Sequence, residues 1–239
     1  MSPVYAWSRR SAALVLVTVI LAGCQSGRIA PADAAGVSKP DECCKPAGSA
    51  ITDGKSIEIP AATPWIVREK RRPLSCLDAR YTDQDEHRGT LKDESDRPTV
   101  LTFFYTRCQN TQKCSAAITQ LGSLERTIAR AGLAGRVHLL AVSFEPQWDD
   151  PARLKRFVLD RGMTVGQYAK AVRLDQDGHA KLIQELQVPV GYNAGWVNSH
   201  GLALYLLDDR GRLARTYHTV LWSNDDVVAD LKKLTAERQ

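Results

Sequence analysis

The 239-residue sequence lacks a large excess of charge of either sign. It has 32 Lys and Arg residues against 27 Asp and Glu residues, which gives a net charge of +5. Loss of a leader that contains Arg9 and Arg10 would lower this charge by two, to +3. Nucleic-acid-binding domains carry a concentrated basic stripe. We therefore expect no nucleic-acid partner, and we interpret the one dense basic run, residues 68–72, as a solvated loop.

The apolar run near the N-terminus is too short for a membrane-spanning helix. Residues 12–22 are uncharged and mostly apolar, whereas a spanning helix needs about 20 such residues. Two arginines precede this run and Leu-Ala-Gly-Cys ends it, so the segment resembles a bacterial lipoprotein leader. The resemblance implies a signal peptide at residues 1–23 and an acylated Cys24. An ordinary secretory leader followed by a chance cysteine is the alternative.

An acylated Cys24 would tether the protein outside the cytoplasm. Two or three acyl chains hold a protein stably on a membrane, whereas one chain alone is marginal. We therefore expect a lipid-anchored protein on the periplasmic face. Gln25 after the cysteine resembles the pattern of outer-membrane sorting, but the choice between inner and outer membrane stays open.

The cysteine count is odd once Cys24 is set aside. Of the six cysteines, five remain, so at least one thiol of an exported protein is unpaired, blocked or a metal ligand. Cys43 and Cys44 are adjacent and can pair with each other, with other thiols or with Cys76. Cys76 can also be a small buried apolar residue.

The composition divides the exported chain into a tether and one domain. Residues 24–64 are rich in Gly, Ala, Ser, Pro and Asp and show no sustained period, which predicts a flexible tether. A folded domain is expected over residues 65–239. No internal repeat is visible in it.

Predicted strands and helices alternate within this domain. Continuous β-branched and aromatic runs predict buried strands at residues 99–105 and 137–143. Apolar residues spaced by three and four predict a helix over about 112–130, and Asp150-Pro151 opens another. Further predicted elements are a hairpin or loop within 81–97, a short helix at 180–186, strands at 202–207 and 213–219, and a helix capped by Ser223. This order predicts an α/β, thioredoxin-like fold with a central mixed sheet flanked by helices.

Cys108 and Cys114 follow the first buried strand and lie at the entry to a helix. Ligand and redox sites of open α/β sheets lie at this edge. The helix N-terminus, together with Arg107 and Lys113, favours thiolates. Five residues separate the two cysteines, so both sulfurs can converge on one disulfide or one metal ion. A disulfide that only staples the loop is the alternative, although so short a span closes little chain.

Several segments are similar to the Sco/SenC family, membrane-tethered thioredoxin-like proteins associated with copper delivery to cytochrome oxidase. The similar segments are TFFYTRC at 102–108, Cys114, AVSFEP at 141–146 and DPARL at 150–154. The resemblance covers roughly residues 74–236 and implies copper ligation by Cys108, Cys114 and His200. Family members usually have three residues between the cysteines and a proline after the second, whereas this chain has five and Ser115.

The donor types agree with this resemblance. Two thiolates select Cu(I), and an imidazole makes a site competent for Cu(II) as well. Among the five histidines, His200 is the one that the predicted topology directs at the sulfurs. A hydrogen-bonded loop histidine is the alternative for His200.

The resemblance implies a metallochaperone more than a turnover enzyme. Its partners would be a cytochrome oxidase subunit or another copper protein, and a thiol reductant that keeps Cys108 and Cys114 reduced. Cys43 and Cys44 would then be able to relay copper. The alternative is a thiol–disulfide oxidoreductase or thiol peroxidase that uses Cys108 and Cys114 as a redox-active pair, although no Cys-x-x-Cys is present. A copper or redox sensor is the third hypothesis.

Overall fold

A computed structural model describes residues 51–52, 55–56, 61–219 and 222–238 of the chain. The predicted signal peptide, Cys24, Cys43 and Cys44 lie outside the described residues. Ile51–Thr52 (β1) and Lys55–Ser56 (β2) pair as a short antiparallel ladder. Among the described residues, none of the helices combines the length and the apolar character that a membrane span requires.

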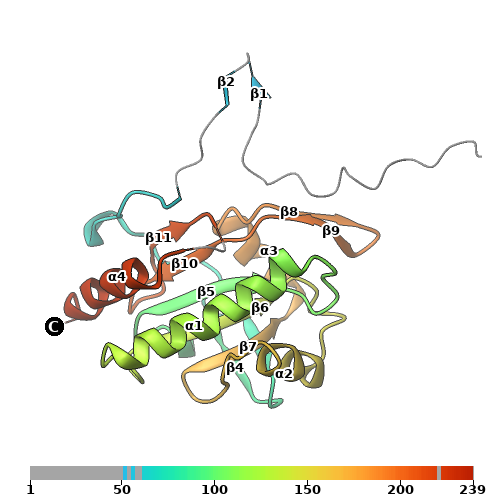
Figure 1. The fold of residues 1–239 in the computed structure, drawn as a ribbon, viewed down its shortest axis with the longest axis horizontal. Coiled ribbons are helices and arrows are strands. Elements are labelled where there is room, and N and C mark those ends of the chain that lie inside the picture. The colour runs from blue at the N-terminus through green and yellow to red at the C-terminus, as the bar shows by residue number, and fades with distance from the viewer. Residues whose placement is uncertain (1–50, 53–54, 57–60, 220–221, 239) are drawn as a thin grey trace, which may run out of the picture. The chain divides into compact units, whose positions relative to one another are not determined.

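A seven-stranded mixed sheet, in the order β11-β10-β5-β6-β7-β3-β4, forms the centre of the domain (Figure 1). Thr99–Phe104 (β5) and His138–Ser143 (β6) are parallel, and every residue of both is buried. These two strands confirm the prediction made from the apolar runs. Ala169–Leu174 (β7) lies parallel to β6 and was not predicted, because Lys170 and Arg173 interrupt its apolar residues.

Antiparallel hairpins complete the two edges of this sheet. Leu204–Leu207 (β10) pairs with β5 and with Leu213–Tyr217 (β11), which confirms the predicted hairpin. At the other edge, Arg80–Asp83 (β3) pairs with β7 and with Arg88–Thr90 (β4), so the segment predicted as a hairpin or loop contains a hairpin. Two short 3-10 helices, Arg68–Lys70 (η2) and Leu91–Glu94 (η3), flank this hairpin in the sequence.

Helices cover both faces of the sheet. Ala116–Arg130 (α1), which crosses one face in Figure 1, packs in one apolar cluster with Pro151–Leu159 (α2) and Asn224–Ala236 (α4). Gln176–Glu185 (α3) packs through Leu182 in the second cluster. The fold is the predicted α/β arrangement of a mixed sheet flanked by helices.

The helix starts follow the capping chemistry of the sequence. Asp150 accepts a hydrogen bond from the Arg153 amide, and Ser223 accepts one from the Asp226 amide, as predicted. α3 starts four residues earlier than expected, because Asp175 caps it by accepting from the amide of Gly178. At the N-terminal boundary, the Thr63 amide donates to the carbonyl of Thr216, so part of the segment expected as tether pairs beside β11.

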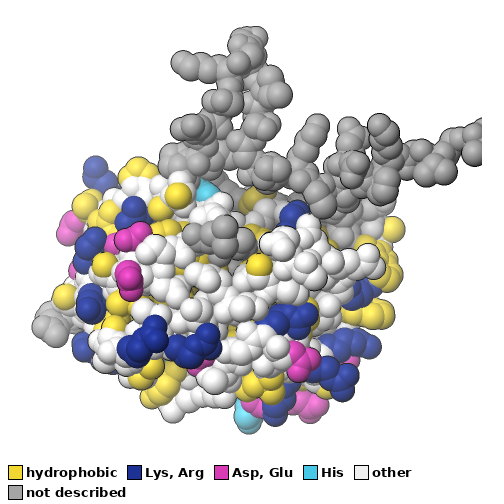
Figure 2. Space-filling view, viewed as in Figure 1, with side chains coloured by type: hydrophobic (Ala, Val, Ile, Leu, Met, Phe, Trp, Pro, Cys, Tyr) yellow, Lys and Arg dark blue, Asp and Glu magenta, His cyan; other side chains and the backbone are white. Residues whose placement is uncertain are grey.

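The surface shows basic and acidic side chains side by side. On the face seen in Figure 2, Lys and Arg side chains lie in several separate groups, with Asp and Glu side chains beside some of them.

Candidate metal centre

The two cysteines lie beyond the carboxyl end of β5, where the chain turns into α1. Cys108 is half-buried in the loop. Cys114 lies in a single π-helical turn, Thr111–Ser115 (η4), which continues directly into α1. Asn110 caps this turn by accepting a hydrogen bond from the Gln112 amide. This wide turn takes up part of the five-residue spacing between the two cysteines. Cys114, which lies in the turn, is fully buried.

His200 comes from a separate hairpin that was not predicted from the sequence. Val190–Asn193 (β8) and Trp196–His200 (β9) form their own two-stranded antiparallel sheet. Ala194 and Gly195 connect the two strands and both have positive φ angles, as a type I′ hairpin turn requires. The hairpin ends with His200, so this side chain lies at the edge of the domain that holds the cysteines.

The structure brings the three predicted ligands together. The Nε2 atom of His200 lies 3.8 Å from the Sγ atom of Cys108 and 3.8 Å from that of Cys114. All three donor atoms lie within 4.8 Å of one another, and both cysteines are free. Bonds of about 2.3 Å to sulfur and 2.0 Å to nitrogen, as in zinc proteins, would separate the two atoms by about 3.7 Å in a trigonal site. Both nitrogen–sulfur distances therefore agree with ligation of a single metal ion by the three residues.

The imidazole of His200 is oriented by its neighbours. Its Nδ1 atom lies 3.2 Å from the carbonyl oxygen of Gly201, so a ring protonated on Nδ1 presents the Nε2 lone pair to the two sulfurs. The rings of Tyr105 and Phe144 each lie 5.3 Å from the imidazole. Lys113 donates a hydrogen bond of 3.2 Å to the backbone carbonyl of His200. Such outer contacts fix the tautomer and direction of a metal-binding histidine.

The two sulfurs differ in their protonation. A hydrogen bond from the Cys114 thiol holds the pKa of Cys108 well below its ordinary value and outweighs the opposing effect of burial. Burial, and then the charged Cys108 sulfur beside it, raise the pKa of Cys114. The metal-free site therefore holds one thiolate and one thiol. Binding of a metal ion by both sulfurs must release the Cys114 proton.

The pH dependence of alkylation tests this assignment. In reduced, metal-free protein, we expect iodoacetamide to modify Cys108 at nearly the same rate at about pH 6 and pH 8, because a thiolate is already present. An ordinary cysteine would slow roughly tenfold per pH unit below its pKa. Mass spectrometry of the alkylated peptides measures both rates. Cys76 provides the control, because burial raises its pKa to about 12; a Cys108 rate that falls tenfold per unit would contradict the assignment.

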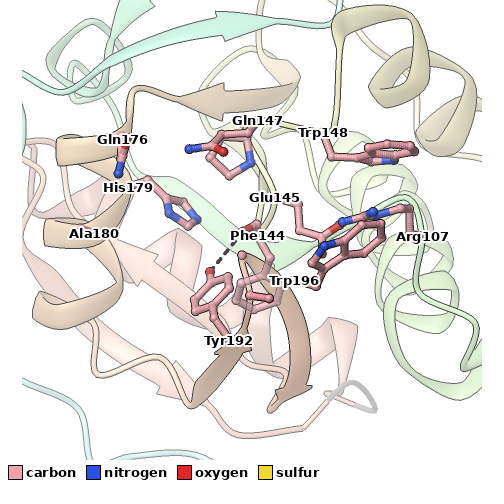
Figure 3. Close-up of a pocket in the computed structure, with 13 residues that line it drawn as sticks. Arg107, Phe144, Glu145, Gln147, Trp148, Gln176, His179, Ala180, Tyr192 and Trp196 are labelled. Carbon is pink, nitrogen blue, oxygen red and sulfur yellow. Dashed lines mark hydrogen bonds and ion pairs between the residues drawn. The ribbon is translucent and has the colours of Figure 1, made fainter.

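Arg107 does not act on the sulfurs in the way that the sequence suggested. Its Nε atom donates a 2.8 Å hydrogen bond to Glu145, and its guanidinium lies over the rings of Trp148 and Trp196 (Figure 3). Glu145 is a buried carboxylate that also accepts a 3.0 Å hydrogen bond from the Val197 amide. The signal for this role is an acidic residue two positions after a buried strand.

A pocket of about 510 Å³ opens beside this arginine. Trp196, Tyr192 and His179 contribute to its walls, and Tyr192 donates a hydrogen bond to the carbonyl of Phe144 (Figure 3). Phe144 also contacts His200. The pocket and the sulfur site therefore share one wall.

Two other histidines and the third described cysteine contribute no donor to the group of Cys108, Cys114 and His200. His138 is buried at the start of β6 and pairs with Glu94 and Asp96 at 3.0 and 2.8 Å. His179 is buried on α3, and burial lowers its pKa to about 4. Cys76 is free and buried in the second apolar cluster, as expected of a small apolar residue.

Comparison with known proteins agrees with the residues that form the site. The SCO1/SenC family model matches residues 78–236. The chain belongs to the SCO1/SenC family. The match contains both cysteines, His200 and Glu145. A search of curated proteins found no match.

Solved structures of this family have the same fold. A SCO1/SenC family lipoprotein from Bacillus anthracis is 22% identical, with a TM-score of 0.60 over 71% of this chain and 99% of that one. Bradyrhizobium japonicum ScoI, solved with copper bound, is 23% identical, with a TM-score of 0.53 over 65% and 96%. BsSco, described as a member of the Sco family of cytochrome c oxidase assembly proteins, is 17% identical, with a TM-score of 0.57 over 66% and 92%.

Proposed function

We propose that this SCO1/SenC protein binds one copper ion through Cys108, Cys114 and His200 and delivers it to another copper protein outside the cytoplasm. The observation that carries the proposal is the position of the His200 Nε2 atom, 3.8 Å from each of the two sulfurs. Copper-bound ScoI from B. japonicum supports the choice of metal.

The donor set suits both oxidation states of copper. Two thiolates favour Cu(I), and the imidazole supplies a nitrogen ligand that Cu(II) accepts. Copper is cargo in this proposal: the partner's ligands replace these three donors one by one, and the oxidation state of the metal does not change. A disulfide between Cys108 and Cys114 would block loading, so a dithiol reductant must supply two electrons and two protons.

The recipient and the membrane anchor follow from relatives and from the leader. BsSco is described as an oxidase assembly protein, which supports a cytochrome oxidase subunit as the recipient. The B. anthracis relative is described as a lipoprotein, which supports a lipid anchor at Cys24 after removal of residues 1–23. Residues 24–64 would then tether the domain of residues 65–239 above the membrane.

Copper titration of the reduced protein tests the proposal. We expect one equivalent of Cu(I) and one of Cu(II), and His200→Ala should weaken Cu(II) by about 100-fold, the loss of about 3 kcal/mol. Cu(I) affinity should fall less, because both sulfurs remain. His218→Ala, at an exposed histidine after β11, is the control. Equal affinity of His200→Ala and wild type for Cu(II) would contradict ligation by His200.

A thiol–disulfide oxidoreductase is the second candidate, favoured by the half-exposed, low-pKa Cys108 beside a protonated Cys114. Such a pair has an attacking thiolate and a resolving thiol. Rapid turnover of insulin or peroxide by the metal-free protein would favour this candidate. Stoichiometric copper binding without such turnover would favour the first.

A further inference from the structure

The hairpin that carries His200 is not part of the central sheet. β8 and β9 pair only with each other, whereas the loop of Cys108 follows β5 at the centre of the seven-stranded sheet. The main sheet holds only the C-terminal end of this hairpin, because His200 lies four residues before Leu204 of β10, which pairs with Thr102 of β5. The rest of β9 has no ladder to the main sheet, so side-chain contacts must hold it against the cysteine loop.

Arg107 and Glu145 supply a direct connection between these parts. Arg107 precedes Cys108 in the chain and donates to one carboxylate oxygen of Glu145 at 2.8 Å. The other oxygen of Glu145 accepts from the amide of Val197, on β9, at 3.0 Å. One buried carboxylate, two residues beyond the end of β6, thus joins the cysteine loop to the strand that ends in His200.

Two partly exposed tryptophans cover the arginine of this connection. The Arg107 guanidinium lies 3.4 Å from the ring centre of Trp196 and 4.2 Å from that of Trp148 (Figure 3). The side chains of Arg107 and Glu145 are only 19% and 3% exposed. A shielded ion pair with cation–π contacts is stronger than a solvated surface pair, so this connection can hold the hairpin in place.

We propose that Arg107, Glu145, Trp148 and Trp196 form a clamp that positions His200 and so determines how strongly the site holds Cu(II) relative to Cu(I). The inference rests on the proposed function. Arg107 and Glu145 are positioning residues here, because they act on His200 through β9 and do not themselves bind the metal ion. Loosening the clamp moves the imidazole away from the sulfurs, which remain as the Cu(I) pair.

Substitutions that break the clamp should separate the two copper affinities. Arg107→Met and Glu145→Gln are each expected to weaken Cu(II) by about 10- to 100-fold, the usual effect of losing a contact that orients a metal ligand. Cu(I) affinity should change less than about threefold, because both sulfurs remain. Arg107→Lys, which keeps the charge, should recover part of the Cu(II) affinity. Competition titrations with chelators of each ion measure the affinities, and the Cu(II) electron paramagnetic resonance spectrum reports loss of the nitrogen ligand.

The ion pair of Arg215 and Asp230 provides a matched control. Its N–O distance is 2.9 Å and its side chains are 28% and 2% exposed, close to the values of the Arg107–Glu145 pair. It lies on β11 and α4, which contribute no ligand to the site. Arg215→Met should therefore leave both copper affinities unchanged, even if it lowers stability by a similar amount.

The possible results separate this inference from the proposed function. Failure of wild-type protein to bind copper would overturn the proposed function. Wild-type binding with unchanged Cu(II) affinity in Arg107→Met and Glu145→Gln would overturn the clamp alone. Equal losses of Cu(I) and Cu(II) affinity would also overturn it, because they indicate general damage rather than loss of His200 positioning.

Discussion

Cys108→Ser and Cys114→Ser are each expected to lower the Cu(I) affinity of the reduced protein by about a thousandfold. Structural zinc sites bind their ion with an apparent free energy of roughly 12 kcal/mol. On that scale, loss of one donor of three costs about 4 kcal/mol of binding free energy, which corresponds to about a thousandfold in affinity. Serine oxygen is a hard donor and does not replace a thiolate for Cu(I). Anaerobic competition with a Cu(I) chelator measures the change.

Cys76→Ser serves as the control for these two variants. Cys76 is the third thiol of the described residues, and it lies in the apolar cluster on the other side of the sheet from Cys114. Its replacement should leave Cu(I) affinity unaltered. Wild-type affinity in Cys108→Ser or Cys114→Ser would show that copper binds elsewhere.

Phe104→Ala is expected to destabilise the domain by about 3–5 kcal/mol. Phe104 is fully buried at the end of β5, and its ring lies 5.3 Å from that of Phe157 on α2. Alanine would leave a cavity between the sheet and this helix, where the surrounding side chains cannot close in completely. The free energy of unfolding, measured with urea at constant protein concentration, gives the loss.

Leu159→Ala is the comparison for Phe104→Ala. Leu159 ends the same helix, α2, but is 46% exposed, so its truncation should change stability by less than about 0.5 kcal/mol. A loss below about 1 kcal/mol for Phe104→Ala would mean that the core tolerates the cavity.

The parts of the fold that could be predicted are those with a strong local pattern. β5 and β6 are continuous apolar runs, and α1 has apolar residues at helical spacing. β7 was missed because the half-buried Lys170 and Arg173 interrupt its apolar residues. The β8–β9 hairpin was missed because its residues are mostly polar or exposed and its stability depends on contacts with distant segments.

The metal site was predictable only in part, because its residues come from segments that are distant along the chain. Cys108 and Cys114 follow a buried strand, so their convergence could be expected from local sequence. The choice of His200 depended on a predicted topology and on family resemblance, because 85 residues separate it from Cys114 along the chain. The role of Glu145 was missed, since its two partners, Arg107 and Val197, are distant in sequence and meet only in the folded chain.

The tryptophan pair around Arg107 also gives the protein an intrinsic optical reporter. The rings of Trp148 and Trp196 lie 6.0 Å apart, close enough for their electronic transitions to couple. Trp196 lies on the strand that ends in His200, so a displacement of that strand alters the coupling and hence the near-ultraviolet circular dichroism. Release of the hairpin in the Arg107 and Glu145 variants can therefore be detected without a dye or an isotope label attached to the protein.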